Sequence, residues 1–322
     1  MNNYTRSQQL LHRLALSSSF LREALFDLEK KLFFKENSVS AHSHVFIAGM
    51  ARSGTTTLLN ALYQTNLFAS LSYADMPFVL SPNLWAKFNK GASSSKPQVR
   101  AHGDGIEIDN RSPEAFEEVF WQTFDPEDPS TLAEFSTFIS LVLKKAQKAR
   151  YLSKNNQNIQ RIALLAKHYP DAKFIIPFRE PRQHSFSLLS QHQKFCSLQR
   201  EEPFVRKYMF WIGHREFGLD YCPSTDQESQ YTNTDTMDHW LEQWLGNYQN
   251  LQKFSKYANV QLVCYEDLCT DKQVWSSILR FIQVDQATRF NFRKSEKEIG
   301  LPYDTSLFER CTALYQQLRD LQ

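Results

Sequence analysis

The residues from Gly49 to Thr57 combine small, hydroxyl-bearing and cationic side chains in one short run. Glycine lets the backbone approach a bound anion closely, and the run contains two glycines, Gly49 at its start and Gly54. Arg52 lies between them and supplies a fixed positive charge. Hydroxyl groups that can donate hydrogen bonds occur at Ser53, Thr55, Thr56 and Thr57. This composition suits the binding of a phosphate or a similar anion.

The spacing of the two glycines also permits a comparison with the Walker A loop, G-x-x-x-x-G-K-[ST], whose lysine contacts the β- and γ-phosphates. Thr55 stands in the position of that lysine, and the cation has moved to Arg52. A nucleotide kinase or triphosphatase would therefore lack its main contact to the γ-phosphate. Two alternatives stay open from this loop alone: a P-loop-type nucleotide kinase, and a strand-to-helix turn without a ligand.

A second pair of candidate anion-binding residues, Arg179 and Ser187, follows an apolar run from Phe174 to Phe178. Such a run is typical of a strand buried in a parallel sheet. Pro181 favours the first turn of a helix directly after the strand. This pattern places Arg179 at a strand end and Ser187 on the helix. The alternative is that Arg179 is an ordinary surface residue.

The two stretches together resemble the PAPS-dependent sulfotransferases, and the pattern is most similar to the carbohydrate, tyrosylprotein and bacterial members. The family's loop for the 5′-phosphosulfate reads [KR]-S-G-T-T, which residues 52–56 match. Its 3′-phosphate loop has R-[DN]-P and a serine eight residues after the arginine, although Glu180 replaces the usual Asp or Asn here. The resemblance implies PAPS (3′-phosphoadenosine 5′-phosphosulfate) as donor, adenosine 3′,5′-bisphosphate (PAP) as product, and no required metal. The residues that it implies for PAPS binding are Arg52, Ser53, Gly54, Thr55, Thr56, Thr57, Arg179 and Ser187.

Two further segments add to the resemblance. Lys154 stands where related enzymes have K-[NDS]-P, with the proline lost, and the resemblance assigns it, with Arg52, to the charge on the leaving phosphate. Residues 265–268, Tyr-Glu-Asp-Leu, resemble a tetrad that the family places after its last core strand. The implied reaction is in-line transfer of the sulfuryl group to an acceptor hydroxyl, and a carbohydrate or glycoconjugate is the expected acceptor.

Asp75 is the expected base that takes the proton from the acceptor hydroxyl. Related carbohydrate and tyrosylprotein enzymes carry a glutamate at nearly the same distance after the first loop, near the end of the second strand. The polar segment from Arg100 to Asp109 offers two alternative bases, His102 and Glu107. Each has a structural alternative, because Asp75 could cap a turn and the polar segment could be a solvated hairpin.

The elements that must position these residues predict a three-layer α/β fold: a short central parallel sheet flanked by helices, with a P-loop-like nucleotide-binding core. Strands are expected at 45–48, 67–72, 174–178 and 260–265. We expect a single domain over 41–322, with acceptor-binding insertions near 87–111 and 195–235. Residues 1–40 have leucines at helical spacing and predict one amphipathic helix packed on the domain; a homodimer or membrane-surface contact is the alternative.

Composition narrows the function classes. A net charge of +2 over 322 residues argues against the broad basic surface that nucleic-acid binding needs. The five cysteines form no C-x-x-C pair, which favours a cytoplasmic protein without a metal site. No run reaches the roughly 18 apolar residues of a transmembrane helix. Besides the kinase, a non-catalytic carbohydrate-binding protein that uses the aromatic residues between 196 and 230 stays an alternative.

Overall fold

The computed structural model describes residues 5–35, 43–89, 98–99, 107–225, 229–285, 289–294 and 296–322. The chain divides into two compact units. The first unit consists of Met1–His42, Leu62–Ser153 and Glu202–His214. The second unit consists of Ser43–Ala61, Lys154–Glu201 and Arg215–Gln322.

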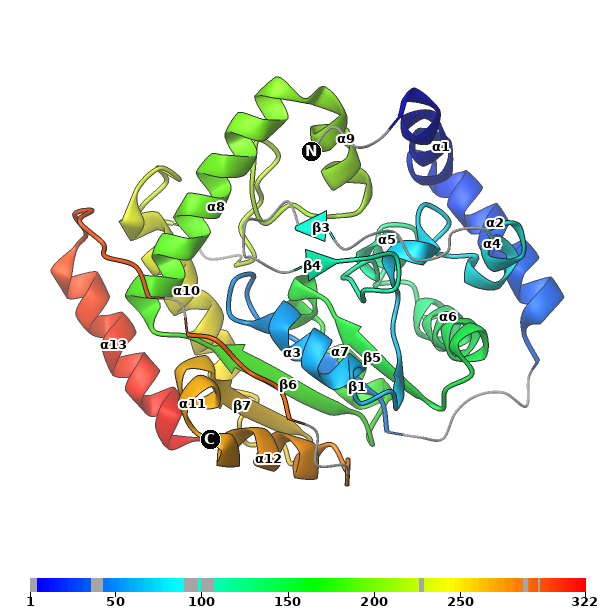
Figure 1. Ribbon diagram of the computed structural model, residues 1–322. Coiled ribbons are helices and arrows are strands. Elements are labelled where there is room, and N and C mark those ends of the chain that lie inside the picture. Colours follow the sequence, from blue (N-terminus) through cyan, green and yellow to red (C-terminus); the bar gives the residue numbers. More distant parts are fainter. Residues whose placement is uncertain are drawn as a thin grey trace. The chain divides into compact units, whose positions relative to one another are not determined.

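Short parallel strands form a five-stranded sheet with the order β2-β5-β1-β6-β7, which confirms the α/β fold class (Figure 1). The pairs β2–β5, β1–β6 and β6–β7 are all parallel. The strands are β1 (Val45–Ile47), β2 (Phe68–Ala69), β5 (Arg150–Lys154), β6 (Lys173–Phe178) and β7 (Val260–Cys264). The expected strands at 45–48, 174–178 and 260–265 are thus present, and only two residues of the expected strand at 67–72 are strand.

The second unit is built on β1, β6 and β7. The rings of Phe46 in β1 and Phe174 in β6 stack with centroids 5.3 Å apart, because these residues are register partners. Trp244 and Tyr248 of the same unit are fully buried, and the Tyr248 hydroxyl donates to the Pro177 carbonyl of β6 at 2.9 Å. The helices of this unit are the start of α3 (Thr55–Tyr63), α7 (Ile162–His168), α8 (Pro181–Glu201), α10 (Met237–Gln252), α11 (Tyr265–Thr270), α12 (Lys272–Phe281) and α13 (Thr305–Asp320), with the 3-10 turn η3 (Asn156–Gln160). Helix α10 packs against both α8 and α13.

The first unit is mainly helical. It contains α1 (Arg6–Leu16), α2 (Ser19–Phe33), α4 (Pro82–Phe88), α5 (Glu118–Trp121), α6 (Thr131–Ala146) and α9 (Pro203–Trp211), with the 3-10 turn η2 (Tyr73–Asp75). The two-residue strands β3 (Gln98–Val99) and β4 (Glu107–Ile108) pair antiparallel. Its core is aromatic: the ring of Phe26 lies 6.2 Å from that of Phe120 and 6.4 Å from that of Phe138.

The amino-terminal segment differs from the expected single helix. It forms two helices, because Ser18 adopts an extended conformation and its side chain accepts a hydrogen bond from the Leu21 N–H at the start of α2. Serine favours this capping position over the helix interior. Helix α2 contacts α4 and α6, so this segment does pack within its unit. Among the described residues, no helix combines the length and apolarity that a bilayer crossing requires.

Candidate functional site

The loop between β1 and α3, residues 48–54, is the part of the second unit that the sequence marks for anion binding. Two of its residues have positive φ angles, 69° at Arg52 and 99° at Gly54. A β-carbon at position 54 would lie 2.3 Å from Cδ2 of Tyr265, so glycine is required there. An arginine in the left-handed region costs about 1–3 kcal/mol, which the surrounding contacts must offset.

Two carbonyl oxygens of the loop accept hydrogen bonds from other groups of the protein. The Met50 carbonyl accepts hydrogen bonds from the Ser53 N–H at 3.2 Å and the Ser53 hydroxyl at 2.8 Å. The Arg52 carbonyl accepts from Nη1 of Arg179 at 3.1 Å. These oxygens are therefore engaged inside the protein, while the first N–H groups of α3 have no carbonyl partner within their helix. An anion at the start of α3 would meet donors and the positive end of the helix dipole.

His184 on α8 contacts Ala51, the loop residue between Met50 and Arg52. It is fully buried, and its Nε2 lies 2.8 Å from the Ala51 carbonyl oxygen. Burial, followed by the charges of Arg179 and Arg52, lowers the pKa of His184 to about 3. The ring is therefore neutral at physiological pH, and Nε2 must carry the hydrogen, because a carbonyl can only accept. The sequence did not identify this residue as part of the site. Its position five residues after Arg179, on the helix that follows, would have indicated that it lies near the loop.

The structure brings Arg52, Arg179 and Ser187 into one cluster. Nε of Arg52 donates to the Ser187 hydroxyl at 3.1 Å, besides the bond from Arg179 to the Arg52 backbone. Nε of Arg179 lies 3.7 Å from Oε1 of Glu266, and its guanidinium lies 5.7 Å from the centroid of the Tyr265 ring. The sequence placed these residues in two separate anion sites, and the fold makes those sites neighbours.

The hydroxyl groups of the loop differ in what they contact. Ser53 is fully buried, and its hydroxyl is used within the loop. Thr57 shares a side-chain hydrogen bond with Tyr265, whose pKa burial raises to about 12. Thr55 is buried at the first position of α3, and Thr56 beside it is half-buried. The side chains of Ser53 and Thr57 therefore form contacts within the protein, whereas Thr55 and Thr56 lie at the end of α3 where the sequence predicts an anion to bind.

Lys154 is the last residue of β5, a strand that the sequence did not predict, and it is only 6% exposed. The next residue, Asn155, donates its N–H to the Ile47 carbonyl at 3.4 Å. The Asn155 side chain accepts from the Gln157 N–H at 3.0 Å and so starts η3. These bonds fix Lys154 beside the end of β1, where the loop begins.

Asp75, the base predicted from the sequence, lies in the first unit at the end of η2 and is 1% exposed. Its Oδ2 accepts from the Ser72 N–H at 2.8 Å and the Ser72 hydroxyl at 3.0 Å. Its Oδ1 forms an ion pair with Lys145. Both carboxylate oxygens are therefore engaged, and the assignment of Asp75 as base stays a prediction.

The two alternative bases lie in the polar segment. His102 lies outside the described residues. Glu107 is the first residue of β4 and is the register partner of Val99 in the antiparallel pair. Over the part of the chain that the structure describes, no group of three or more His, Cys, Asp or Glu side chains could hold a metal ion.

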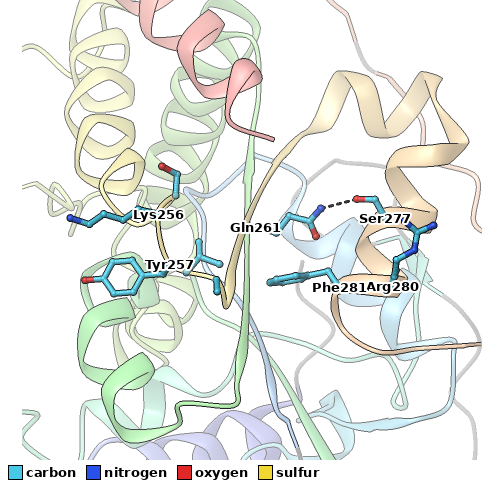
Figure 2. A pocket seen from close by; sticks show the side chains of 9 residues that line it. Lys256, Tyr257, Gln261, Ser277, Arg280 and Phe281 are labelled. Atoms are coloured by element: carbon cyan, nitrogen blue, oxygen red, sulfur yellow. Dashed lines mark hydrogen bonds between the residues drawn. The ribbon is translucent and has the colours of Figure 1, made fainter.

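A separate surface cavity of about 510 Å³ lies beside β7, the outermost strand of the sheet, and α12 (Figure 2). It is lined by Lys256, Tyr257 and Arg280, together with Gln261 and Ser277, whose side chains share a 2.8 Å hydrogen bond. Val260, which also lines the cavity, is the first residue of β7, so the cavity lies at the amino end of a strand. Ligands of parallel sheets bind at the carboxyl ends. The β1–α3 loop is therefore the better candidate site.

Comparisons with solved structures give matches with low sequence identity. A sulfotransferase from Mycobacterium tuberculosis matches at 16% identity with a TM-score of 0.50, over 96% of this chain and 84% of that protein. A sulfotransferase from Mycobacterium avium matches at 14% identity with a TM-score of 0.49, over 98% and 79%. Because the sequence identity is so low, the match to the Mycobacterium tuberculosis enzyme shows a similarity of fold alone. A mouse sulfotransferase solved in complex with PAP matches at 12% identity with a TM-score of 0.34, over 89% and 68%.

Comparison with curated protein sequences finds no significant match. The family model described as "Sulfotransferase family" matches residues 44–287. This range includes the β1–α3 loop, Arg179 directly after β6, Ser187 on α8, and Lys154 at the end of β5. The match covers well over half of the chain, and the chain therefore belongs to the sulfotransferase family.

Proposed function

We propose that this sulfotransferase uses PAPS as its donor and transfers the sulfuryl group to a hydroxyl of a carbohydrate or glycoconjugate. The observation that carries the donor assignment is the cluster of Arg52, Arg179 and Ser187 at the start of α3. Two guanidinium groups and a helix N-terminus suit the two phosphate ends of one nucleotide. The carbohydrate acceptor rests on the sequence, through the aromatic residues between 196 and 230.

The residues present fit an anionic donor by charge. Arg52 and Arg179 carry two positive charges. The carboxylate of Glu266, 3.7 Å from Nε of Arg179, compensates one of them. Lys154 adds a third cation at the end of β5. When bound, PAPS supplies a sulfuryl group attached to a phosphate that can leave. The chain's own part is to hold that phosphate at the start of α3 and to stabilise the charge that develops on it with Arg52, Lys154 and the hydroxyls of Thr55 and Thr56.

Isothermal titration with PAP tests the donor assignment. Wild type should bind PAP, and Arg52→Ala should bind it about 10- to 150-fold more weakly, since a hydrogen bond to a charged group contributes about 1.5–3 kcal/mol. Arg200→Ala, which changes an exposed arginine on α8, is the matched control and should bind PAP normally. Binding of ATP with magnesium and none of PAP would instead favour the nucleotide kinase.

Incubation with ³⁵S-labelled PAPS and a glycan panel tests the acceptor. Label should appear on at least one glycan with wild type and on none with Arg52→Ala. PAP binding with transfer only to non-carbohydrate hydroxyls would refute the carbohydrate acceptor and keep the donor. Glycan binding without PAP binding would favour the non-catalytic carbohydrate-binding protein. Family membership favours sulfuryl transfer over both alternatives.

A further inference from the structure

A small cavity lies beside the β1–α3 loop, entirely within the second unit. Its volume is about 30 Å³, and its walls include Met50 and Ala51 of the loop, Leu188 and Trp240 from two helices, and the carboxylate-bearing Glu216. A cavity of this size holds about one water-sized group. It therefore has room for a single hydroxyl group, and the rest of a larger molecule would have to lie outside it.

Glu216 is connected to the anion-binding end of α3 by two hydrogen bonds. Nδ2 of Asn156 donates to Oε1 of Glu216 at 2.9 Å. The hydroxyl of Thr55, the first residue of α3, donates to Oδ1 of the same Asn156 at 3.4 Å. Asn156 follows Lys154 by two residues at the start of η3. The amide thus orients both the carboxylate and a loop hydroxyl, and it places Glu216 next to the proposed donor site.

The remaining oxygen of Glu216 differs from the oxygens of Asp75. Within the described part of the chain, Oε2 of Glu216 accepts no hydrogen bond, and the residue is half-buried at the cavity wall. Both oxygens of Asp75 are occupied by Ser72 and Lys145. A general base needs a lone pair within hydrogen-bond reach of the proton that it takes. Of these two carboxylates, Glu216 has an oxygen whose lone pairs are not used by the described residues.

We propose that Glu216 is the catalytic base of the sulfuryl transfer and that the cavity holds the reacting hydroxyl of the acceptor. This inference rests on the proposed function. The acceptor oxygen forms a bond to sulfur, and the bond between sulfur and the bridging phosphate oxygen breaks. Its electron pair goes to the phosphate, which leaves as PAP held by Arg52 and Lys154. The acceptor proton goes to Oε2 of Glu216, so charge and atoms balance.

Water is a suitable probe acceptor, because it fits the cavity and requires no knowledge of the natural acceptor. Release of ³⁵S-sulfate from PAPS in buffer is measured for wild type, Glu216→Gln and Glu216→Ala. Glutamine keeps an oxygen that accepts from Asn156 but cannot take a proton. We expect sulfate release to fall about 10²- to 10⁴-fold in Glu216→Gln. Formate should restore part of the rate in Glu216→Ala, since a small carboxylate can enter the space left by the side chain.

Titration calorimetry with PAP and thermal melting provide readouts that do not depend on turnover. The PAP dissociation constant and the melting temperature of Glu216→Gln should match those of wild type. Glu309→Gln, an exposed carboxylate on α13, is the control and should change none of the measurements. Normal sulfate release by Glu216→Gln would overturn the assignment, as would a loss of PAP affinity without formate rescue, which indicates a structural role.

Two outcomes for wild type separate this inference from the function on which it rests. PAP binding without any sulfate release would overturn the cavity as the site of proton removal and leave the donor assignment intact. No PAP binding by wild type would overturn the donor assignment, and the role of Glu216 would fall with it.

Discussion

Replacing His184 with glutamine should remove a pH-dependent part of the stability of the second unit. Burial and the charges of Arg179 and Arg52 lower the pKa of His184 from 6.5 to about 3. Between these two values the unfolded chain binds a proton that the folded protein does not. Stability from this residue is therefore fully present above about pH 6.5 and is lost progressively as the pH falls towards about 3.

The size of the effect follows from the width of this window. Each pH unit below 6.5 costs about 1.36 kcal/mol, so lowering the pH from 7.5 to 5.0 should cost wild type about 2 kcal/mol through His184. The glutamine variant should not show this loss, because its amide does not titrate. The amide N–H can still donate to the Ala51 carbonyl, which His184 contacts at 2.8 Å.

Urea unfolding followed by tryptophan fluorescence at pH 7.5 and pH 5.0 measures the difference. Other groups also titrate, including His192 and His239, whose pKa values burial lowers. Their contributions cancel when the pH effect in the variant is subtracted from that in wild type. If unfolding shows more than one transition, the transition that responds to the substitution is the one to compare. Equal losses of stability in both proteins would refute the neutral, buried state of His184.

Two further predictions concern carboxylates of the first unit. Glu29→Ala should reduce the free energy of unfolding by about 2–4 kcal/mol at pH 7, measured by urea unfolding, because the fully buried Glu29 accepts from the Asn83 N–H, the Asn83 side chain and the Leu84 N–H at 2.8–2.9 Å. A change under 0.5 kcal/mol would show that water replaces the carboxylate. Asp75→Asn should lower the melting temperature through loss of the ion pair with Lys145, with PAP affinity and sulfate release retained. A hundredfold slower turnover would instead make Asp75 the base, as the sequence predicted.

Local pattern was sufficient for three strands and for the loop of the proposed donor site. Apolar β-rich runs at 45–48, 174–178 and 260–265 identify buried strands because each run is short and bounded by turn residues. The small residues of the first loop identify a backbone conformation, and Gly54 indeed has a positive φ of 99°. The strand β5 was missed, since Arg150 to Lys154 is only five residues long and has a cation at each end, and its place between β2 and β1 depends on the tertiary structure.

The amino-terminal segment shows the limit of periodicity. Its leucines recur at helical spacing, and the segment is helical, but periodicity alone does not predict where a serine will end one helix and cap the next. The two-helix arrangement depends on Ser18 accepting from the Leu21 N–H. A serine inside a helical pattern can face solvent or cap, and the neighbouring packing selects between the two.

The sequence by itself determined the family, the α/β class and the residue types of the proposed donor site, because these depend on short runs whose chemistry is local. Tertiary structure alone decided which side chains meet. Arg52 and Ser187 are 135 residues apart, Asn156 and Glu216 are 60 apart, and Asp75 and Lys145 are 70 apart. Hydrogen bonds between such residues arise from the order in which parallel strands lie in the sheet and from helix packing, which no local pattern encodes. For that reason the sequence pointed to Asp75 as base, and only the folded chain drew attention to Glu216.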